Sequence, residues 1–189
     1  MKNEFDKEIN RQGTSSVKWG FIQEGEDLLN WQLTDRYFGE DRVLPLWVAD
    51  MDFRSPQAGV DALVARAQHG IYGYTAPTGS FFQAVIGWMQ RRHGWEISPE
   101  WICLTPGVVP ALHMLVKTFL SPGDKVLIQP PVYYPFYDAI RSNGGEIVAN
   151  PLIYETGTYR MDWADLEQKA SDPGGKMAIL CSSHNPVGR

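Results

Sequence analysis

The chain has few of the residues that form covalent or metal cross-links. Its 189 residues include two cysteines, Cys103 and Cys181, and four histidines. Both cysteines lie in apolar, strand-like runs, so we expect two buried free thiols in a reducing compartment rather than a disulfide. The histidines show no ligand-like spacing with one another or with cysteine, which argues against a zinc site.

Long apolar runs and clusters of basic residues are also missing. No stretch approaches the roughly 18 apolar residues of a membrane-spanning helix, and the charged segment 1–8 lacks the apolar core of a signal peptide. The net charge is −5, and no Lys/Arg cluster is long enough to follow a phosphate backbone. Hydrophobic residues make up 43% of the chain, as in globular proteins. We therefore expect a soluble cytoplasmic protein that binds neither nucleic acid nor membranes.

Helical and strand-like segments alternate in most of the chain. Apolar residues recur at helical spacing before Gly70, and Asp162 can cap a helix through the Asp165 N–H. The expected helices lie at residues 55–70, 78–94, 108–120, 135–143 and 162–169, and the expected strands at 101–105, 125–129, 146–150 and 177–183. This alternation predicts an α/β fold with a mostly parallel sheet and helices on both faces.

The first part of the chain differs from the rest. Residues 1–45 are polar and irregular, with aromatic residues scattered among charges. They predict an arm or a part of a small domain. The α/β domain is then expected to occupy residues 46–189.

One predicted strand ends in a glycine turn that opens a helix. Gly107 lets the backbone approach a ligand closely, and the next two residues, Val108 and Val109, carry N–H groups at the helix start. Such N–H groups and the helix dipole favour an anion. Most junctions of this kind bind nothing, so this signal alone leaves the question open.

Of two other strand ends, one carries three tyrosines (Tyr133, Tyr134 and Tyr137) and the other carries Asn185. A tyrosine can offer a flat face to a planar ring, and an asparagine amide can donate a hydrogen bond without changing its charge. Taken singly, aromatic packing at a strand–helix corner and an Asn-Pro turn are the simpler interpretations.

Two polar segments in the first half of the chain leave a similar choice. Residues 72–75 form an aromatic turn between helices, for which loop packing is the simpler interpretation. Asp50 and Asp52 could take part in acid–base chemistry, although capping of the helix near residues 55–56 is the simpler role.

Three of these signals fall at the ends of predicted strands. Because ligands of open α/β sheets bind at the carboxyl ends of the strands, we expect the three to meet. Together they supply a phosphate cradle, a stacking ring and an amide that can hold an oxygen. Pyridoxal 5'-phosphate needs all three.

With these motifs, the chain resembles the fold-type I pyridoxal-phosphate enzymes of the aminotransferase class I/II superfamily. More narrowly, it resembles the cystathionine β-lyase branch typified by MalY and PatB. The motifs that carry the resemblance lie at residues 11–14, 18–19, 47–53, 69–74, 131–136 and 184–189. The resemblance implies that residues 46–189 form the N-terminal part of an aspartate aminotransferase-like, cofactor-binding large domain, with residues 1–45 belonging to a small domain.

The resemblance also implies roles for single residues. Gly107, Val108 and Val109 would hold the cofactor phosphate, Tyr133 would stack on the pyridine ring, and Asn185 would bind the ring's phenolic oxygen. Across a homodimer interface, Tyr74 would reach the phosphate of the neighbouring cofactor. Ala49 and Asp50 would lie near the amino-acid end of a small-molecule substrate. The bonds 130–131 and 185–186 are candidates for cis peptides.

The family's reactive groups are expected beyond residue 189. These are the lysine that forms the Schiff base with the cofactor, the aspartate at the ring nitrogen, and the arginine that binds the substrate carboxylate. None of Lys117, Lys125, Lys169 or Lys176 lies in the expected motif, so we expect no catalytic residue within this chain.

Three functions follow as alternatives. The first is a pyridoxal-phosphate carbon–sulfur β-lyase that converts a sulfur amino acid into thiol, pyruvate and ammonia. The second is an aminotransferase with the same cofactor site. The third is a non-catalytic fragment or interaction module, which is the expectation for the isolated 189-residue chain.

Overall fold

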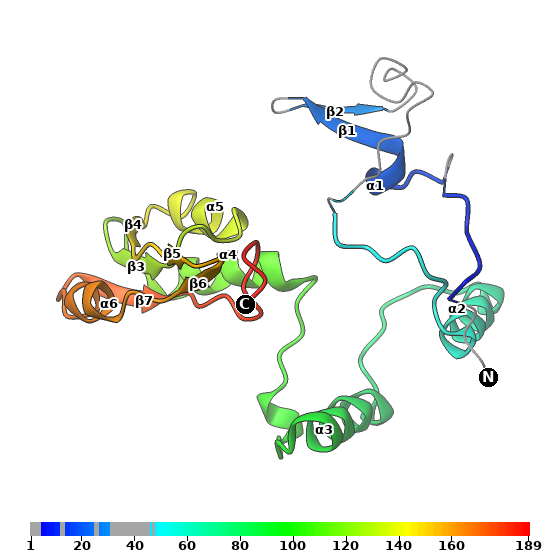
Figure 1. Ribbon diagram of the computed structural model, residues 1–189. Coiled ribbons are helices and arrows are strands. Elements are labelled where there is room, and N and C mark those ends of the chain that lie inside the picture. The colour runs from blue at the N-terminus through cyan, green and yellow to red at the C-terminus, as the bar shows by residue number, and fades with distance from the viewer. Residues whose placement is uncertain (1–4, 12–13, 25–26, 31–45, 47) are drawn as a thin grey trace, which may run out of the picture. The chain divides into compact units, whose positions relative to one another are not determined.

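The computed structural model divides into two units, Met1–Ala76 and Pro77–Arg189. Figure 1 labels their helices and strands. The predicted boundary between residues 45 and 46 adjoins a stretch outside the described residues, and it stays a prediction. The structure describes residues 5–11, 14–24, 27–30, 46 and 48–189.

The first unit contains a short hairpin and one long helix. Helix α1 (Val17–Gly20) leads into strands β1 (Phe21–Glu24) and β2 (Asp27–Asn30), which pair antiparallel. Helix α2 (Gln57–His69) confirms the helix predicted there, and Gly70 ends it with a left-handed φ of 74°. Its first turn has no side-chain cap, so the capping roles predicted near residues 55–56 are wrong.

The second unit begins with helices. Helix α3 (Gly79–His93) and helix α4 (Val108–Phe119) confirm two predictions, and between them lies the 3-10 helix η2 (Pro99–Trp101). The strand predicted at 101–105 is absent from the described residues. An isolated extended segment is not a strand until a neighbour accepts its hydrogen bonds, and no described strand pairs with it. As a result Cys103 is exposed, and its predicted burial is wrong, while Cys181 is half-buried.

A parallel sheet forms the centre of the second unit. Strands β3 (Lys125–Ile128), β4 (Glu146–Ala149) and β7 (Gly175–Ala178) lie in the order β4-β3-β7, and both pairings are parallel. Helix α5 (Pro135–Arg141) connects β3 to β4, and helix α6 (Trp163–Ala170) precedes β7. This arrangement confirms the predicted α/β class. It shortens the last predicted strand, because pairing with β3 ends at Ala178.

Sequence reasoning missed a small hairpin between β4 and α6. Strands β5 (Ile153–Glu155) and β6 (Thr158–Arg160) pair antiparallel through the two-residue turn Thr156 and Gly157. Both turn residues have positive φ, 51° and 81°, as two-residue hairpins of one common type require. The Thr-Gly pair between two short apolar and aromatic runs was the available signal.

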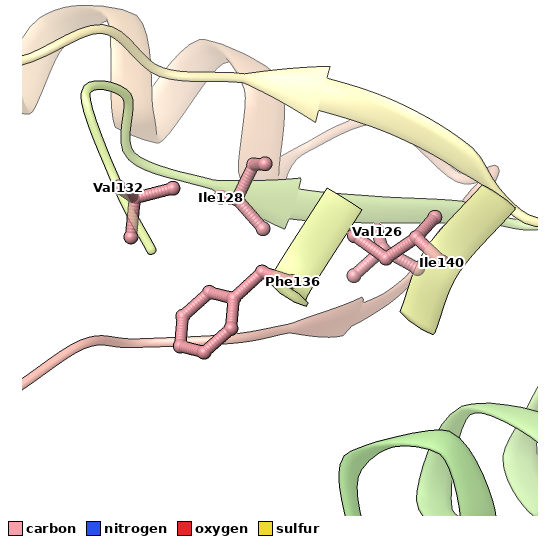
Figure 2. Packing of buried hydrophobic residues seen from close by; sticks show 5 residues of the cluster. All are labelled: Val126, Ile128, Val132, Phe136 and Ile140. Atoms are coloured by element: carbon pink, nitrogen blue, oxygen red, sulfur yellow. The ribbon is translucent and has the colours of Figure 1, made fainter. Parts of the chain in front are cut away.

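The core of the second unit surrounds the central strand β3. Figure 2 shows Phe136 and Ile140 of α5 beside Val126 and Ile128 of β3, with Val132 from the connecting loop. Val126, Ile128 and Ile140 are fully buried. Partly buried residues pack around them, namely Leu112 of α4, Leu120 directly after that helix, Ile147 of β4 and Met177 of β7. The loop that connects β3 to α5 is therefore anchored at both ends in the buried core. By contrast α4, predicted to be buried, buries only Val116.

Candidate functional site

The loops that carry Tyr133 and Asn185 leave the same edge of the sheet. β3 and β7 are parallel neighbours, so the chain emerges from both at their carboxyl ends. His184 joins the two loops, because its Nε2 lies 3.3 Å from the backbone oxygen of Gln129, the first residue after β3. His184 is only 8% exposed. The structure thus brings these two predicted site segments together.

Tyr133 is held by the aromatic corner at the start of α5. Its ring lies edge-on to Phe136, with centroids 6.1 Å apart, and is tilted against Tyr134 at 5.5 Å. Its carbonyl accepts a hydrogen bond from the Phe136 N–H. Tyr133 is half-buried, whereas Tyr134 is 72% exposed. Both proposed cis bonds, Pro130-Pro131 and Asn185-Pro186, are cis in the structure.

Asn185 leaves its side chain free at this edge. Its backbone N–H donates to the Cys181 sulfur at 3.3 Å, which fixes the turn. Within the described part of the chain its amide makes no hydrogen bond, and the residue is exposed. An exposed amide on a fixed turn can bind an oxygen without first breaking another contact.

The start of α4 has the features of an anion site. Gly107 has a φ of 154°, which side-chain-bearing residues rarely adopt, and Thr105 Oγ1 donates to its carbonyl at 3.0 Å. The N–H groups of Val108 and Val109 fall in the first helical turn, where no intrahelical acceptor exists. α4 contacts the core through the partly buried Leu112 and connects to β3 through residues 120–124. So short a connection predicts that α4 runs antiparallel to β3, with its N-terminus at the carboxyl edge of the sheet.

The predicted phosphate-binding residues do not contact the predicted ring-binding residues directly. Among the described residues, no hydrogen bond or ring contact joins Val108 or Val109 to Tyr133 or Asn185. Their common role stays a prediction. Tyr74 belongs to the other unit and is fully exposed.

Ala49 and Asp50 lie in the first unit beside a cluster of charged residues. Arg11 contacts Asp50 and also donates to Asp52 Oδ1 at 2.8 Å. Lys18 Nζ donates to Asp52 Oδ2 at 2.6 Å and to the Asp50 backbone oxygen at 3.1 Å. Trp19 Nε1 donates to Asp52 Oδ1 at 2.7 Å. We call these five side chains (Arg11, Lys18, Trp19, Asp50 and Asp52) the arm clamp.

The arm clamp keeps Asp52 ionised. Hydrogen bonds from Lys18, Trp19 and Arg11 hold the pKa of the Asp52 carboxyl far below its usual range, against a smaller opposing effect of burial. A carboxylate so stabilised is a poor proton acceptor at neutral pH. The hypothesis that Asp50 and Asp52 take part in acid–base chemistry is therefore not supported at Asp52.

Sequence reasoning missed the role of His184 and the arm clamp. His184 belongs to the motif at residues 184–189, in which only Asn185 was assigned a role. The motif does not indicate that the His184 side chain is buried beside the end of β3. Within the described residues, its Nδ1 is buried without a hydrogen-bond partner. No group of three or more potential metal ligands occurs in this part of the chain, and none of its helices is long and apolar enough to cross a membrane.

Comparison with known proteins decides the family. Residues 41–189 match the family described as aminotransferase class I and II. The chain belongs to this family. The resemblance predicted from the motifs is thus confirmed.

Within the aminotransferase class I and II family, the chain is similar to several lyases. It is 50% identical over 185 residues to cystathionine beta-lyase PatB of Bacillus subtilis, a match that covers 98% of this chain and 45% of PatB. Cystalysin from Treponema denticola, solved with a pyridoxal 5'-phosphate cofactor, has a TM-score of 0.86 and 37% identity over 100% of this chain and 45% of that one. A C-S lyase from Staphylococcus hominis bound to PLP has a TM-score of 0.83 and 33% identity, with the same coverage of both chains. The chain spans about half the length of these relatives, and the likeness confirms the predicted fold.

Proposed function

We propose that this chain belongs to a pyridoxal-phosphate carbon–sulfur β-lyase that converts a sulfur amino acid into thiol, pyruvate and ammonia. The observation that carries the proposal is the half-buried ring of Tyr133 and the free amide of Asn185 on loops that leave one sheet edge. Similarity to a cystathionine beta-lyase at 50% identity supports the lyase branch of the family.

The groups at this edge fit pyridoxal phosphate by their chemistry. The N–H groups of Val108 and Val109, beside Gly107, suit a phosphate. The ring of Tyr133 suits stacking on a pyridine, and the amide of Asn185 suits its phenolic oxygen. When bound, the cofactor supplies an electron sink for a negative charge at the substrate Cα.

The residues of this chain bind and orient. Tyr133 and Asn185 would fix the plane of the cofactor ring, while α4 would anchor the phosphate. Ala49 and Asp50 would lie at the amino-acid end of the substrate. Tyr74 would reach the phosphate site of a second subunit, which makes a homodimer part of the proposal. We also propose a cytoplasmic location, and a small-domain arm at residues 1–45 ahead of a large domain at 46–189.

The lysine that carries the cofactor is not expected among residues 1–189. Lys125 pairs with Asp172 at 2.6 Å, and Lys169 pairs with Asp165 at 2.8 Å. Both amines are therefore engaged in ion pairs, and neither lies in the motif expected for the cofactor lysine. On this proposal, the 189-residue chain alone would bind the cofactor without forming the lysine-bound absorbance band.

Incubation of the full-length protein with cystathionine tests the proposal. We expect free thiol and pyruvate in equal amounts. Amino transfer to a keto acid without release of thiol would reject the lyase in favour of the aminotransferase alternative. The isolated 189-residue chain is the control, and it should give neither product.

A further inference from the structure

The arm clamp joins residues that are far apart in sequence through one carboxylate. Asp52 receives three donors, and both of its oxygens are used. The side chains of Arg11 and Lys18 are only 22% and 13% exposed, whereas the Asp52 carboxylate that they share is 39% exposed. This is more organised than a typical surface ion pair.

The arm clamp also holds the turn that contains Ala49. Lys18 contacts the Asp50 backbone as well as the Asp52 carboxylate, and Arg11 bridges both carboxylates. Just before this turn, Val48 has a φ of 51°, which a β-branched residue seldom adopts without support from its surroundings. The clamp contacts begin two residues later and can supply that support.

A groove lies along the same turn. It has a volume of about 400 Å³ and is lined by Lys18 and by residues 46 and 48–53. The clamp residues Lys18, Asp50 and Asp52 thus form part of its wall. A shift of the turn would change the shape of this groove.

We propose that Asp52 is a positioning residue, which holds the turn at Ala49 and Asp50 through Arg11 and Lys18 and so sets the affinity for the amino-acid substrate. This inference rests on the proposed function, because that proposal puts the amino-acid end of the substrate at Ala49 and Asp50. Asp52 itself does not touch the reacting atoms. Its loss should therefore weaken substrate binding more than turnover.

The test is the substitution Asp52→Asn in the full-length holoenzyme. The amide keeps the shape of the side chain and loses the charge that Arg11 and Lys18 contact. We expect KM for cystathionine to rise about tenfold, with kcat within about twofold of the wild type. Trypsin should also cleave after Arg11 and Lys18 about tenfold faster, because their side chains are released.

The matched control is Glu155→Gln. Glu155 makes a two-point ion pair with Arg160 in the hairpin of the other unit, and both side chains are about half exposed. This variant removes an ion-paired carboxylate without touching the clamp. Its KM and its tryptic cleavage after Arg11 should equal those of the wild type.

A second variant guards against a failure of Asp52→Asn to fold. Trp19→Phe removes one donor to Asp52 and leaves both charges of each ion pair in place. It should raise KM about threefold and leave kcat unchanged. If the arm is released in either variant while KM stays at the wild-type value, Asp52 has a structural role only and the inference is overturned.

The outcome separates this inference from the proposed function. If the wild type transfers amino groups and releases no thiol, the lyase proposal fails. The KM for the amino-group donor then tests Asp52 in the same way. A normal KM and normal tryptic cleavage in both variants would overturn the inference even if the lyase reaction is confirmed.

Discussion

Different kinds of contact stabilise the interior of each of the two units. In the second unit, Val126, Ile128 and Ile140 are buried completely around one strand. In the first unit, helix α2 buries none of its residues, and Leu63 on that helix is 74% exposed. The long-range contacts described there include the ion pairs of the arm clamp, together with one edge-on ring contact between Phe5 and Phe53. We therefore expect the stability of the second unit to depend mainly on the volume of its buried side chains. The stability of the first unit should depend more on the charges of the arm clamp.

The largest expected effect comes from a cavity in the second unit. Ile140→Ala removes a fully buried side chain from the cluster shown in Figure 2. We expect this unit of the full-length protein to lose about 4 kcal/mol of its free energy of unfolding, measured with urea. Leu63→Ala, on the exposed face of α2, is the control and should cost less than about 1 kcal/mol. Equal costs at the two sites would contradict the comparison.

A smaller effect is expected at a polar contact within the same unit. Asn150 is fully buried after β4, and its amide donates to the Asp162 carbonyl at 3.1 Å and to Asp165 Oδ2 at 2.7 Å. Asn150→Ala would leave both acceptors without this donor, so we expect a loss of about 2 kcal/mol in the same urea experiment. Gln168→Ala, on the exposed side of α6, should be neutral. A neutral Asn150→Ala would mean that water replaces the amide.

The same contrast explains which parts of the fold were predictable. Helices α2 and α3 end at Gly70 and Gly94, whose left-handed φ values of 74° and 61° follow from local sequence. The Asp162 cap also formed as predicted, with the Asp165 N–H at 3.1 Å. Each of these features depends on residues within one or two helical turns. Local signals of this kind can be read without knowing the rest of the fold.

Features that depend on distant partners were missed or misjudged. A strand at 101–105 needs a neighbour that its own residues do not specify, and Cys103 is exposed as a result. Asp52 was interpreted as a helix cap because residues 55–56 are near in sequence. It instead binds Arg11 and Lys18, 41 and 34 residues away. The cofactor residues were named through the family resemblance, and the tie that His184 makes between two strand ends became visible only in three dimensions.

The smallest effect on overall stability is expected from acid acting on the arm clamp. The pKa of Asp52 is held below its ordinary value of 3.8, so its contacts stabilise the folded arm fully above that value. This contribution is lost as the pH falls from about 4 through the lowered pKa of the folded state. Amide hydrogen exchange in residues 14–19, corrected for the intrinsic effect of pH, should become faster below pH 4. Exchange at Val126, Leu127 and Ile128 of β3 should change much less over the same range, because their apolar burial does not titrate and acid weakens only the ion pair of Lys125 with Asp172 at the start of the strand.

Asp52→Asn is the decisive control for this acid effect. The variant should show fast exchange in residues 14–19 already at neutral pH, with no further increase in acid, since the titrating carboxylate is gone. Slow exchange in residues 14–19 of the wild type down to pH 2 would contradict this prediction. It would mean that protonation of Asp52 in this pH range does not release the arm. Fast exchange in wild-type β3 over the same pH range would erase the difference between the two units, because apolar packing would then depend on charge as well.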